Sequence, residues 1–146
     1  MFEVPYEFTD SIPYLLNRVG VRLGERFSSQ LLEHDVTLSM YRVLAVLRQR
    51  GEKTLSELAE LVSVEVSTLS RLVGQLVRRG LVSRVRPVTN GRIVQINLTE
   101  KGTHLADRLM PVAAMYEETA VDGLDPETVV ALKRTLRHIN RNISKL

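Results

Sequence analysis

The chain has 146 residues, of which 44% are apolar, enough for one compact domain or for a small core with elements that need a partner. It contains no cysteine, which excludes a disulfide, a thiolate metal site and a thiol redox switch. No apolar stretch approaches the roughly 18 residues that a membrane span needs, and the acidic, proline-bearing N-terminus does not resemble a signal peptide. We therefore expect a cytoplasmic protein.

The first two predicted elements are helices. Apolar residues recur at three- and four-residue spacing over residues 11–34, which predicts one long amphipathic helix. A second helix is predicted over residues 40–49, with Thr37 or Ser39 as its N-cap and Gly51 as its end.

The central part of the chain has the pattern of two helices joined by a tight turn. Thr54 and Glu57 have the spacing of a capping box, which predicts a short third helix over residues 54–62. A fourth helix is predicted over residues 66–79 and ends at Gly80. A hairpin follows, because residues 81–86 and 92–98 alternate or are β-branched and an Asn-Gly turn signal lies between them.

Two further helices complete the chain. Thr99 caps a fifth helix that extends to about Glu118 and contains Pro111, which should kink or divide it. Asp125 as N-cap and Pro126 in the first turn start the sixth helix. The predicted fold class is mainly α with a small β-hairpin wing: a winged helix-turn-helix flanked by long N- and C-terminal helices.

The net charge of +3 is modest, but it is unevenly distributed. Residues 66–92 contain six arginines and no Asp or Glu, whereas residues 99–127 are mainly acidic and the last helix is basic again. The six are Arg71, Arg78, Arg79, Arg84, Arg86 and Arg92. The basic last helix fits ordinary solubility, but an acid-free window with six arginines is the pattern expected where a protein meets a polyanion.

On a helical wheel, residues 66–79 separate into a buried and an outward face. The buried face consists of Leu69, Leu72, Val73 and Leu76. The outward face carries Ser67, Thr68, Arg71, Gly74, Gln75 and Arg78, with Ser70 at its margin. Short side chains let a helix enter a major groove, where Ser and Thr bond to phosphates or base edges and Arg grips guanine bidentately. The start of the helix also offers free N–H groups and a positive dipole end to phosphate.

Arginines also mark the predicted hairpin. Arg84, Arg86 and Arg92 suit a narrow minor groove, where the negative potential is enhanced. Each alone would be interpreted as a solvated surface charge, but together with the two central helices they favour binding to double-stranded DNA. A protein-binding winged helix is the main alternative, which the salt dependence of DNA binding would distinguish.

An enzyme is the poorer hypothesis. His34, His104 and His138 lack the spacing of a metal site, and the chain has neither a nucleophile motif nor a glycine-rich phosphate loop. We therefore expect no catalytic residue, no metal and no cofactor.

Four segments stand in a specific order and spacing: residues 55–62 (LSELAELV), 67–73 (STLSRLV), 76–82 (LVRRGLV) and 96–102 (INLTEKG). In this order they resemble the MarR family of bacterial winged helix-turn-helix transcriptional regulators. The resemblance implies a homodimer that represses transcription from a pseudo-palindromic operator. Each recognition helix would enter a major groove, and each wing would reach the adjacent minor groove.

The predicted DNA-binding set is Ser67, Thr68, Ser70, Arg71, Gln75, Arg84, Arg86, Asn90 and Arg92. By position, the resemblance implies base and phosphate contacts for the four members between 67 and 71, and it implies that Arg92 is the wing-tip arginine. Asn90 stands where the family usually has an Asp that orients this arginine, so a bond from Arg92 to it would lack a charge.

The resemblance also implies how the chain is divided. A single MarR-like domain would cover residues 1–146, with the winged helix-turn-helix over 37–98, its recognition helix over 66–79 and its wing over 81–98. Dimerisation helices would cover residues 11–35 and 99–146. The C-terminal interface candidates are Leu105, Leu109, Val112, Val129, Val130, Leu132, Leu136, Ile139, Ile143 and Leu146. In the alternative, a monomer, these helices would fold back on the DNA-binding part.

Many members of the family are released from DNA by small phenolic or aromatic acids or their thioesters, bound between the dimer helices and the winged helix. The polar groups that could line such a cleft here are Tyr14, Arg18, Arg22, Tyr41 and His104. Each also fits a surface or packing role, so the sequence assigns no ligand-binding residue. Because cysteine is absent, the thiol-peroxide sensing branch of the family is excluded.

Overall fold

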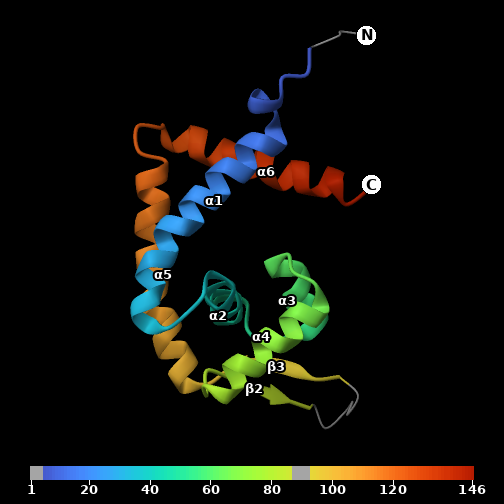
Figure 1. Cartoon of the computed structure of the whole chain (residues 1–146), viewed down its shortest axis with the longest axis vertical. Coiled ribbons are helices and arrows are strands. Elements are labelled where there is room, and N and C mark those ends of the chain that lie inside the picture. The colour runs from blue at the N-terminus through green and yellow to red at the C-terminus, as the bar shows by residue number, and fades with distance from the viewer. Residues whose placement is uncertain (1–4, 87–92) are drawn as a thin grey trace. The chain divides into compact units, whose positions relative to one another are not determined.

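The computed structural model describes residues 5–86 and 93–146, and the chain forms two compact units, Met1–Ala113 and Ala114–Leu146 (Figure 1). The elements of the first unit are η1 (Phe8–Asp10), α1 (Ile12–Leu31), η2 (Leu32–His34), α2 (Leu38–Arg50), β1 (Lys53–Thr54), α3 (Leu55–Val62), α4 (Val66–Arg78), β2 (Val82–Val85), β3 (Gln95–Leu98) and most of α5 (Glu100–Ala120). The second unit holds the end of α5 and all of α6 (Pro126–Ile143). The predicted fold class is confirmed: the described part of the chain is mainly helical with a small sheet.

Capping side chains fix the starts of the first two long helices. The Ser11 hydroxyl accepts a hydrogen bond from the Tyr14 N–H (3.4 Å) at the start of α1. The Thr37 hydroxyl accepts one from the Met40 N–H (3.2 Å), so Thr37 is the N-cap and α2 begins at Leu38, slightly earlier than predicted. Gly51, whose φ is 75°, ends α2 as predicted.

The helix-turn-helix forms as its sequence predicts. Thr54 and Glu57 make both hydrogen bonds of a capping box, each 3.2 Å long, at the start of α3. Ser63 adopts a left-handed conformation (φ 58°) in the turn, and Gly80 (φ 70°) follows the end of α4. A left-handed residue reverses the chain within one position, so α3 and α4 meet at a short turn.

The sheet has three antiparallel strands in the order β1-β3-β2. Val82 lies opposite Leu98 in the β2–β3 hairpin, and Thr54 of β1 lies opposite Gln95. Strand β1 was not predicted from the sequence, because two residues are too few to show an alternating pattern.

The core of the first unit takes side chains from α1 to α5 and from the hairpin. Its fully buried members are Leu31, Val43, Leu44, Leu58, Leu69, Val73, Leu76, Leu81, Val82, Ile96 and Leu109. Leu105 is also buried, with 6% of its surface exposed. Leu105 and Leu109 are therefore wrong as dimer-contact candidates, since they already pack inside one protomer.

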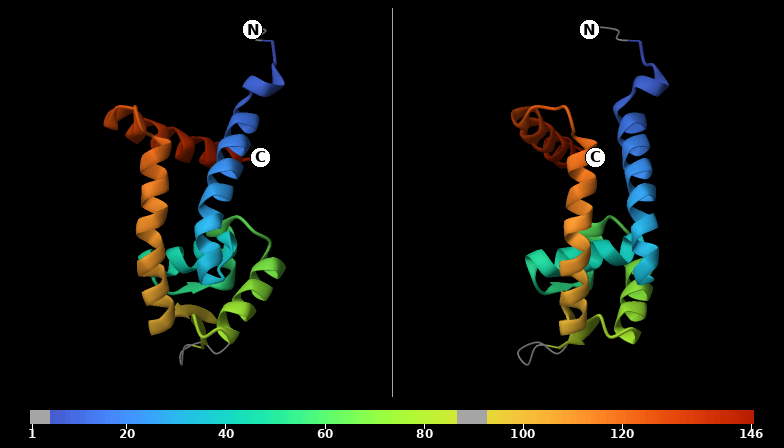
Figure 2. Two further views of the ribbon diagram at one scale, coloured as in Figure 1. Left: turned by 60° about the vertical axis from the view of Figure 1, so that its left-hand side comes forward. Right: turned by 90° about the vertical axis from the view of Figure 1, so that its left-hand side faces the viewer.

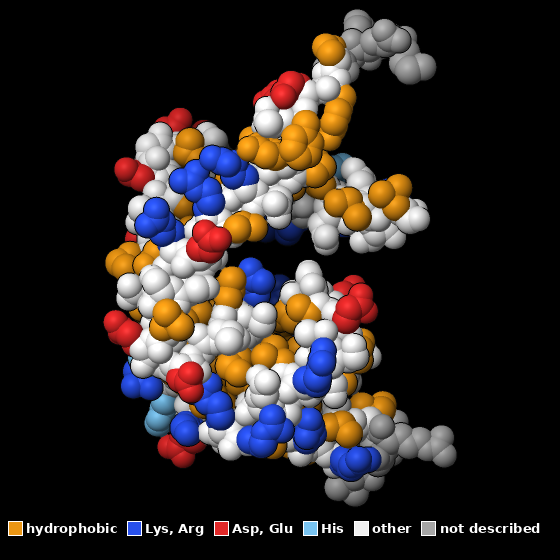
Figure 3. Space-filling model, viewed as in Figure 1, with side chains coloured by type: hydrophobic (Ala, Val, Ile, Leu, Met, Phe, Trp, Pro, Cys, Tyr) orange, Lys and Arg blue, Asp and Glu red, His pale blue; other side chains and the backbone are white. Residues whose placement is uncertain are grey.

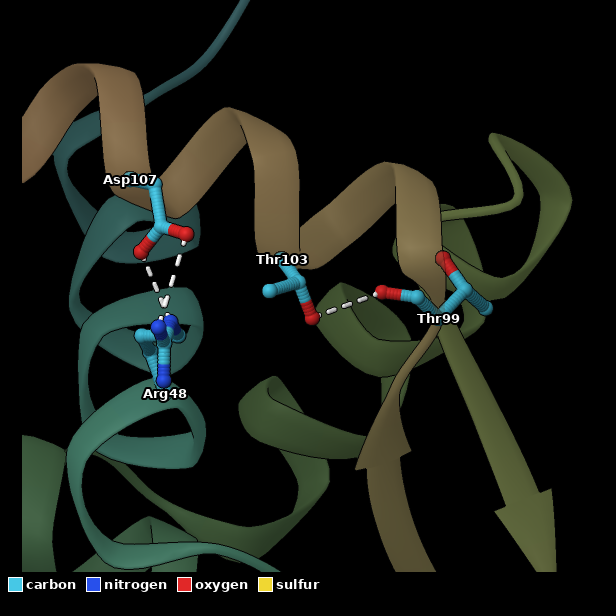
Figure 4. Close-up of polar contacts among 4 residues, drawn as sticks. All are labelled: Arg48, Thr99, Thr103 and Asp107. Atoms are coloured by element: carbon cyan, nitrogen blue, oxygen red, sulfur yellow. Dashed lines mark hydrogen bonds and ion pairs between the residues drawn. The ribbon is translucent and has the colours of Figure 1, made fainter.

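Helix α5 is fixed to the winged helix at its N-terminal end (Figure 4). The Thr99 hydroxyl donates to the Gly80 carbonyl (2.6 Å) and accepts from the Gly102 N–H (3.1 Å), which confirms Thr99 as the cap. The Arg48 guanidinium of α2 binds both carboxylate oxygens of Asp107 on α5, at 2.7 Å and 3.4 Å.

Pro111 does not divide α5. The helix is continuous from Glu100 to Ala120 with Pro111 inside it, so that part of the prediction is wrong. The physical reason is exposure: Pro111 and Asp107 both lie on the exposed face, where water can bond to the Asp107 carbonyl that the proline leaves without a donor.

Helix α6 is amphipathic and begins at the predicted position. Asp125 precedes it without a side-chain capping bond, Pro126 occupies its first turn, and none of its residues is buried. The Lys133 ammonium pairs with the Glu117 carboxylate at 3.0 Å. Among the described residues, no helix has both the length and the apolar character to cross a membrane.

Candidate nucleic-acid interface

Seven of the nine predicted DNA-binding residues lie in the described part of the chain, on α4 and at β2. These two elements lie side by side at the end of the first unit away from the N-terminus (Figure 2). Leu69, Val73 and Leu76 anchor the inner face of α4 in the core. The five predicted residues of α4 are all exposed: Ser67, Thr68, Ser70, Arg71 and Gln75. The structure therefore brings them together on one outward face.

The N-terminal end of α4 differs from that of α3. Glu65 holds the N-cap position of α4, yet its side chain makes no capping hydrogen bond. Its carbonyl accepts only the regular bond from the Leu69 N–H (2.9 Å). The backbone N–H groups of the first turn, beside Ser67 and Thr68, consequently lack a side-chain cap and point outward with the positive end of the helix dipole. Such an end favours an anion.

The hairpin contributes two of the four predicted wing residues to this surface. Arg84 lies on β2, Arg86 follows it directly, and both side chains are exposed. Asn90 and Arg92 lie outside the described residues, so the predicted pairing of these two stays a prediction.

Arg79 has a different role from the other arginines of the acid-free window. Its guanidinium donates to the carbonyls of Asp35 and His34, the latter at 3.2 Å, and lies 3.6 Å from the Met40 sulfur. It therefore joins the end of α4 to the turn between α1 and α2. A helical wheel already places position 79 beside Leu72 at the flank of the buried face, a signal that separates it from Arg71 and Arg78.

Arg78 and Arg84 both reach Gly74, an arrangement that was not predicted from the sequence. A Cβ atom built on Gly74 would lie 3.6 Å from Nη1 of Arg78 and 3.8 Å from Nη2 of Arg84. Arg78 is on the same helix as Gly74, but Arg84 reaches this point from β2. Lys and Arg side chains gather over α4 and β2 in the space-filling view (Figure 3).

The polar groups considered for a ligand are not brought into one pocket. Tyr41 packs edge-to-face on Phe27 with ring centres 4.8 Å apart, and burial raises the pKa of its phenol. It lines a hollow with Leu61 and Val62 of α3, whereas His104 lines a separate hollow with Gly80 and Lys101. Tyr14 lines neither of these two hollows, and its hydroxyl accepts a hydrogen bond from Arg18 (3.4 Å) on α1. The described residues contain no cluster of carboxylate and imidazole groups that could hold a metal.

An exposed helix on a helix-turn-helix, flanked by an antiparallel hairpin, defines a winged helix-turn-helix DNA-binding protein. Residues 36–94 match the model of the MarR family. The transcriptional repressors IacR and NicR of Pseudomonas putida are 28% and 29% identical to this chain over 133 residues, which is 91% of this chain and 80% and 84% of theirs.

Solved structures show the same fold along the whole chain. A MarR family transcriptional regulator of Silicibacter pomeroyi superimposes with a TM-score of 0.87 at 28% identity, over 99% of this chain and 97% of that one. BpsR of Bordetella bronchiseptica, whose DNA binding is regulated by 6-hydroxynicotinic acid, superimposes with a TM-score of 0.82 at 25% identity, over 93% and 97%. Residues 36–94 thus carry a MarR family domain, and the chain is similar over nearly all of its length to DNA-binding transcriptional regulators of that family.

Proposed function

We propose that this regulator is a homodimeric repressor that acts in the cytoplasm on a pseudo-palindromic operator and is released by a small aromatic acid. The observation that carries the proposal is the exposed, acid-free outward face of α4 beside Arg84 of β2 and Arg86, which follows this strand. Residues 37–98 would bind DNA, and residues 11–35 and 99–146 would carry the dimer contacts.

The outward face assigns distinct roles to its side chains. Ser67, Thr68 and Ser70 are short and lie in the first turns of α4, where they let the helix approach base edges and phosphates. Arg71, one turn after Ser67, has the reach for a bidentate contact with guanine. Arg84 and Arg86 would anchor the wing on phosphates or in the minor groove, together with Asn90 and Arg92.

Exposed apolar side chains support the dimer. Ile12, Leu16 and Val19 on α1 are each more than 40% exposed, and so are Leu132 and Ile143, which share one face of α6. Helices with such uncovered apolar stripes gain free energy by pairing. Two copies also match a two-fold operator, which rewards a two-fold protein.

The chemical class of the effector is inferred from a similar protein. BpsR responds to 6-hydroxynicotinic acid, and it covers almost the same length of chain as this protein. We therefore assign a hydroxylated aromatic acid as the class of effector, and no residue of this chain as its ligand. Loss of the protein–DNA complex on addition of 6-hydroxynicotinic acid or a similar acid is the expected result, and no release by any member of such a panel would contradict this part.

DNA binding is tested on an operator selected from bound genomic fragments. Arg71→Ala should weaken operator binding about tenfold to a hundredfold, because a bidentate base contact contributes about 1–3 kcal/mol of discrimination. Binding to unrelated DNA should fall far less. The wild-type affinity should decrease with salt, by about 0.9 in log–log slope for each phosphate contact.

Arg50→Ala is the matched control, since Arg50 is an exposed arginine at the end of α2, outside the predicted DNA-binding set and the proposed dimer helices, and its loss changes the net charge equally. It should bind the operator like the wild type. Equal operator binding by Arg71→Ala and Arg50→Ala would contradict the site, and absence of a salt-dependent interaction with any DNA would contradict the function.

A further inference from the structure

Two cationic side chains from different elements converge on a glycine in the middle of α4. The Cβ position of Gly74 is 3.6 Å from Nη1 of Arg78 and 3.8 Å from Nη2 of Arg84, so the two guanidinium groups flank one small space above the helix backbone. Gly74 has no side chain to fill that space. The arrangement joins the recognition helix to the first strand of the wing.

Neither arginine has a partner that explains its position. Within residues 5–86 and 93–146, Arg78 and Arg84 make no ion pair and no side-chain hydrogen bond, and both are exposed. Arg79, the next residue after Arg78, is by contrast fully engaged with carbonyl groups. Like charges that converge without an acid between them repel, and an oxyanion placed between them removes that repulsion.

Gly74 leaves the helix backbone uncovered beside both guanidinium groups. An oxygen that accepts a charge-assisted bond from each guanidinium lies about 2.8 Å from each nitrogen. The Cβ position is 3.6 Å and 3.8 Å from these nitrogens, so an oxygen held between them, in contact with the Gly74 backbone, would lie where a side chain at position 74 would stand in its way.

We propose that Gly74, Arg78 and Arg84 form a phosphate clamp that holds one phosphodiester group of the bound DNA between the recognition helix and the wing. The clamp deepens the proposed function and rests on it. Its position favours DNA over a free anion, because Ser67, Arg71, Gly74 and Arg78 follow one line along the outward face of α4 at positions i, i+4, i+7 and i+11. A phosphate at Gly74 would thus continue the contacts made at the start of the helix.

The clamp predicts that both arginines contact the same phosphate. The experiment uses the full-length protein and duplexes of the selected operator in which single phosphates are replaced by neutral methylphosphonates. Wild-type binding should fall about tenfold at one position per half-site, and Arg78→Gln and Arg84→Gln should each lower the affinity for unmodified DNA by a similar factor. In both variants the methylphosphonate at that position should have little further effect. In the double variant, the slope of log K against log salt concentration should be less steep by about 0.9 per subunit, the value for one phosphate contact.

Gly74→Ala tests the space itself. A methyl group there makes ordinary contacts of 3.6 Å and 3.8 Å, so the free protein should fold and its Tm should rise, since alanine favours a helix over glycine. Operator binding should nevertheless fall about tenfold, as in the arginine variants. If the Tm of Gly74→Ala falls, its weaker operator binding would reflect misfolding. The binding of Arg78→Gln and Arg84→Gln then decides whether the clamp exists.

The outcomes separate the clamp from the proposed function. Arg50→Gln, outside the predicted DNA-binding set and the proposed dimer helices, is the charge-matched control and should bind like the wild type. If Arg71→Ala loses operator binding while Arg78→Gln and Arg84→Gln match this control, the clamp is wrong and the function stands. If the two arginines respond to methylphosphonates at different positions, a shared phosphate is refuted. Saturation of the site by millimolar inorganic phosphate at constant ionic strength, followed by NMR, would assign it to a free oxyanion and overturn the DNA assignment.

Discussion

The winged helix and the terminal helices cover their apolar side chains to very different extents. Leu44 of α2 is 0% exposed and contacts a closed core, whereas Val19 of α1 is 61% exposed and Val130 of α6 is 56% exposed. The same amphipathic pattern thus leads to burial in one region and to an uncovered surface in the other. The difference indicates that one chain suffices to fold the winged helix, while the terminal helices need a second surface.

The largest expected effect concerns the closed core. Leu44→Ala should lower the free energy of unfolding by about 3 kcal/mol, because it leaves a cavity among fully buried neighbours. Leu136→Ala on α6 is the matched change at a partly exposed leucine and should cost much less at low protein concentration. Urea unfolding at several protein concentrations measures both. If both variants lose the same free energy of unfolding at every protein concentration, the proposed difference between the two regions is wrong.

A charge on the uncovered surface should act on assembly rather than on folding. Leu132→Glu, in the apolar stripe of α6, should raise the dimer dissociation constant about a hundredfold, since burying an unpaired carboxylate at an interface is costly. Ala131→Glu, at an exposed position outside this stripe, is the control. Sedimentation equilibrium reports the dissociation constant and circular dichroism the fold. A wild type that sediments as a monomer at micromolar concentration would contradict the proposed dimer.

Gly102 is the point at which helix α5 packs most closely on the winged helix. A Cβ atom there would lie only 2.0 Å from the Leu81 carbonyl oxygen, so α5 packs directly on the backbone that follows α4. Gly102→Ala should therefore destabilise the fold by about 2 kcal/mol. Gly74→Ala, also within a helix but in ordinary contact distance, should stabilise it by up to about 1 kcal/mol. Thermal unfolding with opposite signs for these two alanines is the expected result.

The smallest effect concerns the capping box of α3. Thr54→Ala should cost about 1 kcal/mol, whereas Ser56→Ala, at an exposed position inside α3, should cost little. The Thr54 backbone N–H, and then its hydroxyl, hold the pKa of Glu57 below its ordinary value of 4.5. A lowered pKa adds stability that is present above pH 4.5 and is lost as the pH falls through the folded-state value. The Glu57→Gln variant should accordingly lose less stability in acid than the wild type does. If its free energy of unfolding falls with pH as steeply as that of the wild type, the capping role of the carboxylate is contradicted.

Local chemistry explains which features were predictable from the sequence. Thr37, Thr54 with Glu57, Gly80 and Thr99 mark helix ends through bonds to residues three or four positions away, and all of them act as predicted. The outward face of α4 was likewise predictable, because a helical wheel needs only the period of the helix.

Features that depend on contacts between distant residues were not predictable. The periodicity of α5 shows that Leu105 and Leu109 share an apolar face, but not whether the same chain or a partner covers it. The strand β1 exists only because β3 pairs with it. The meeting of Arg78 and Arg84 at Gly74 depends on where β2 crosses α4, which no local pattern encodes.

Arg79 has a consequence for the distance between two operator half-sites. Its guanidinium holds the end of α4 to the carbonyls of His34 and Asp35, at the end of η2, which continues from α1. In the proposed dimer, a change in how the two α1 helices pair would therefore be transmitted to α4 and would change the separation of the two recognition helices. That separation has to match about 34 Å, one turn of B-DNA, for both helices to enter the major groove at once. A small rearrangement at the dimer contact would thus be enough to release the operator.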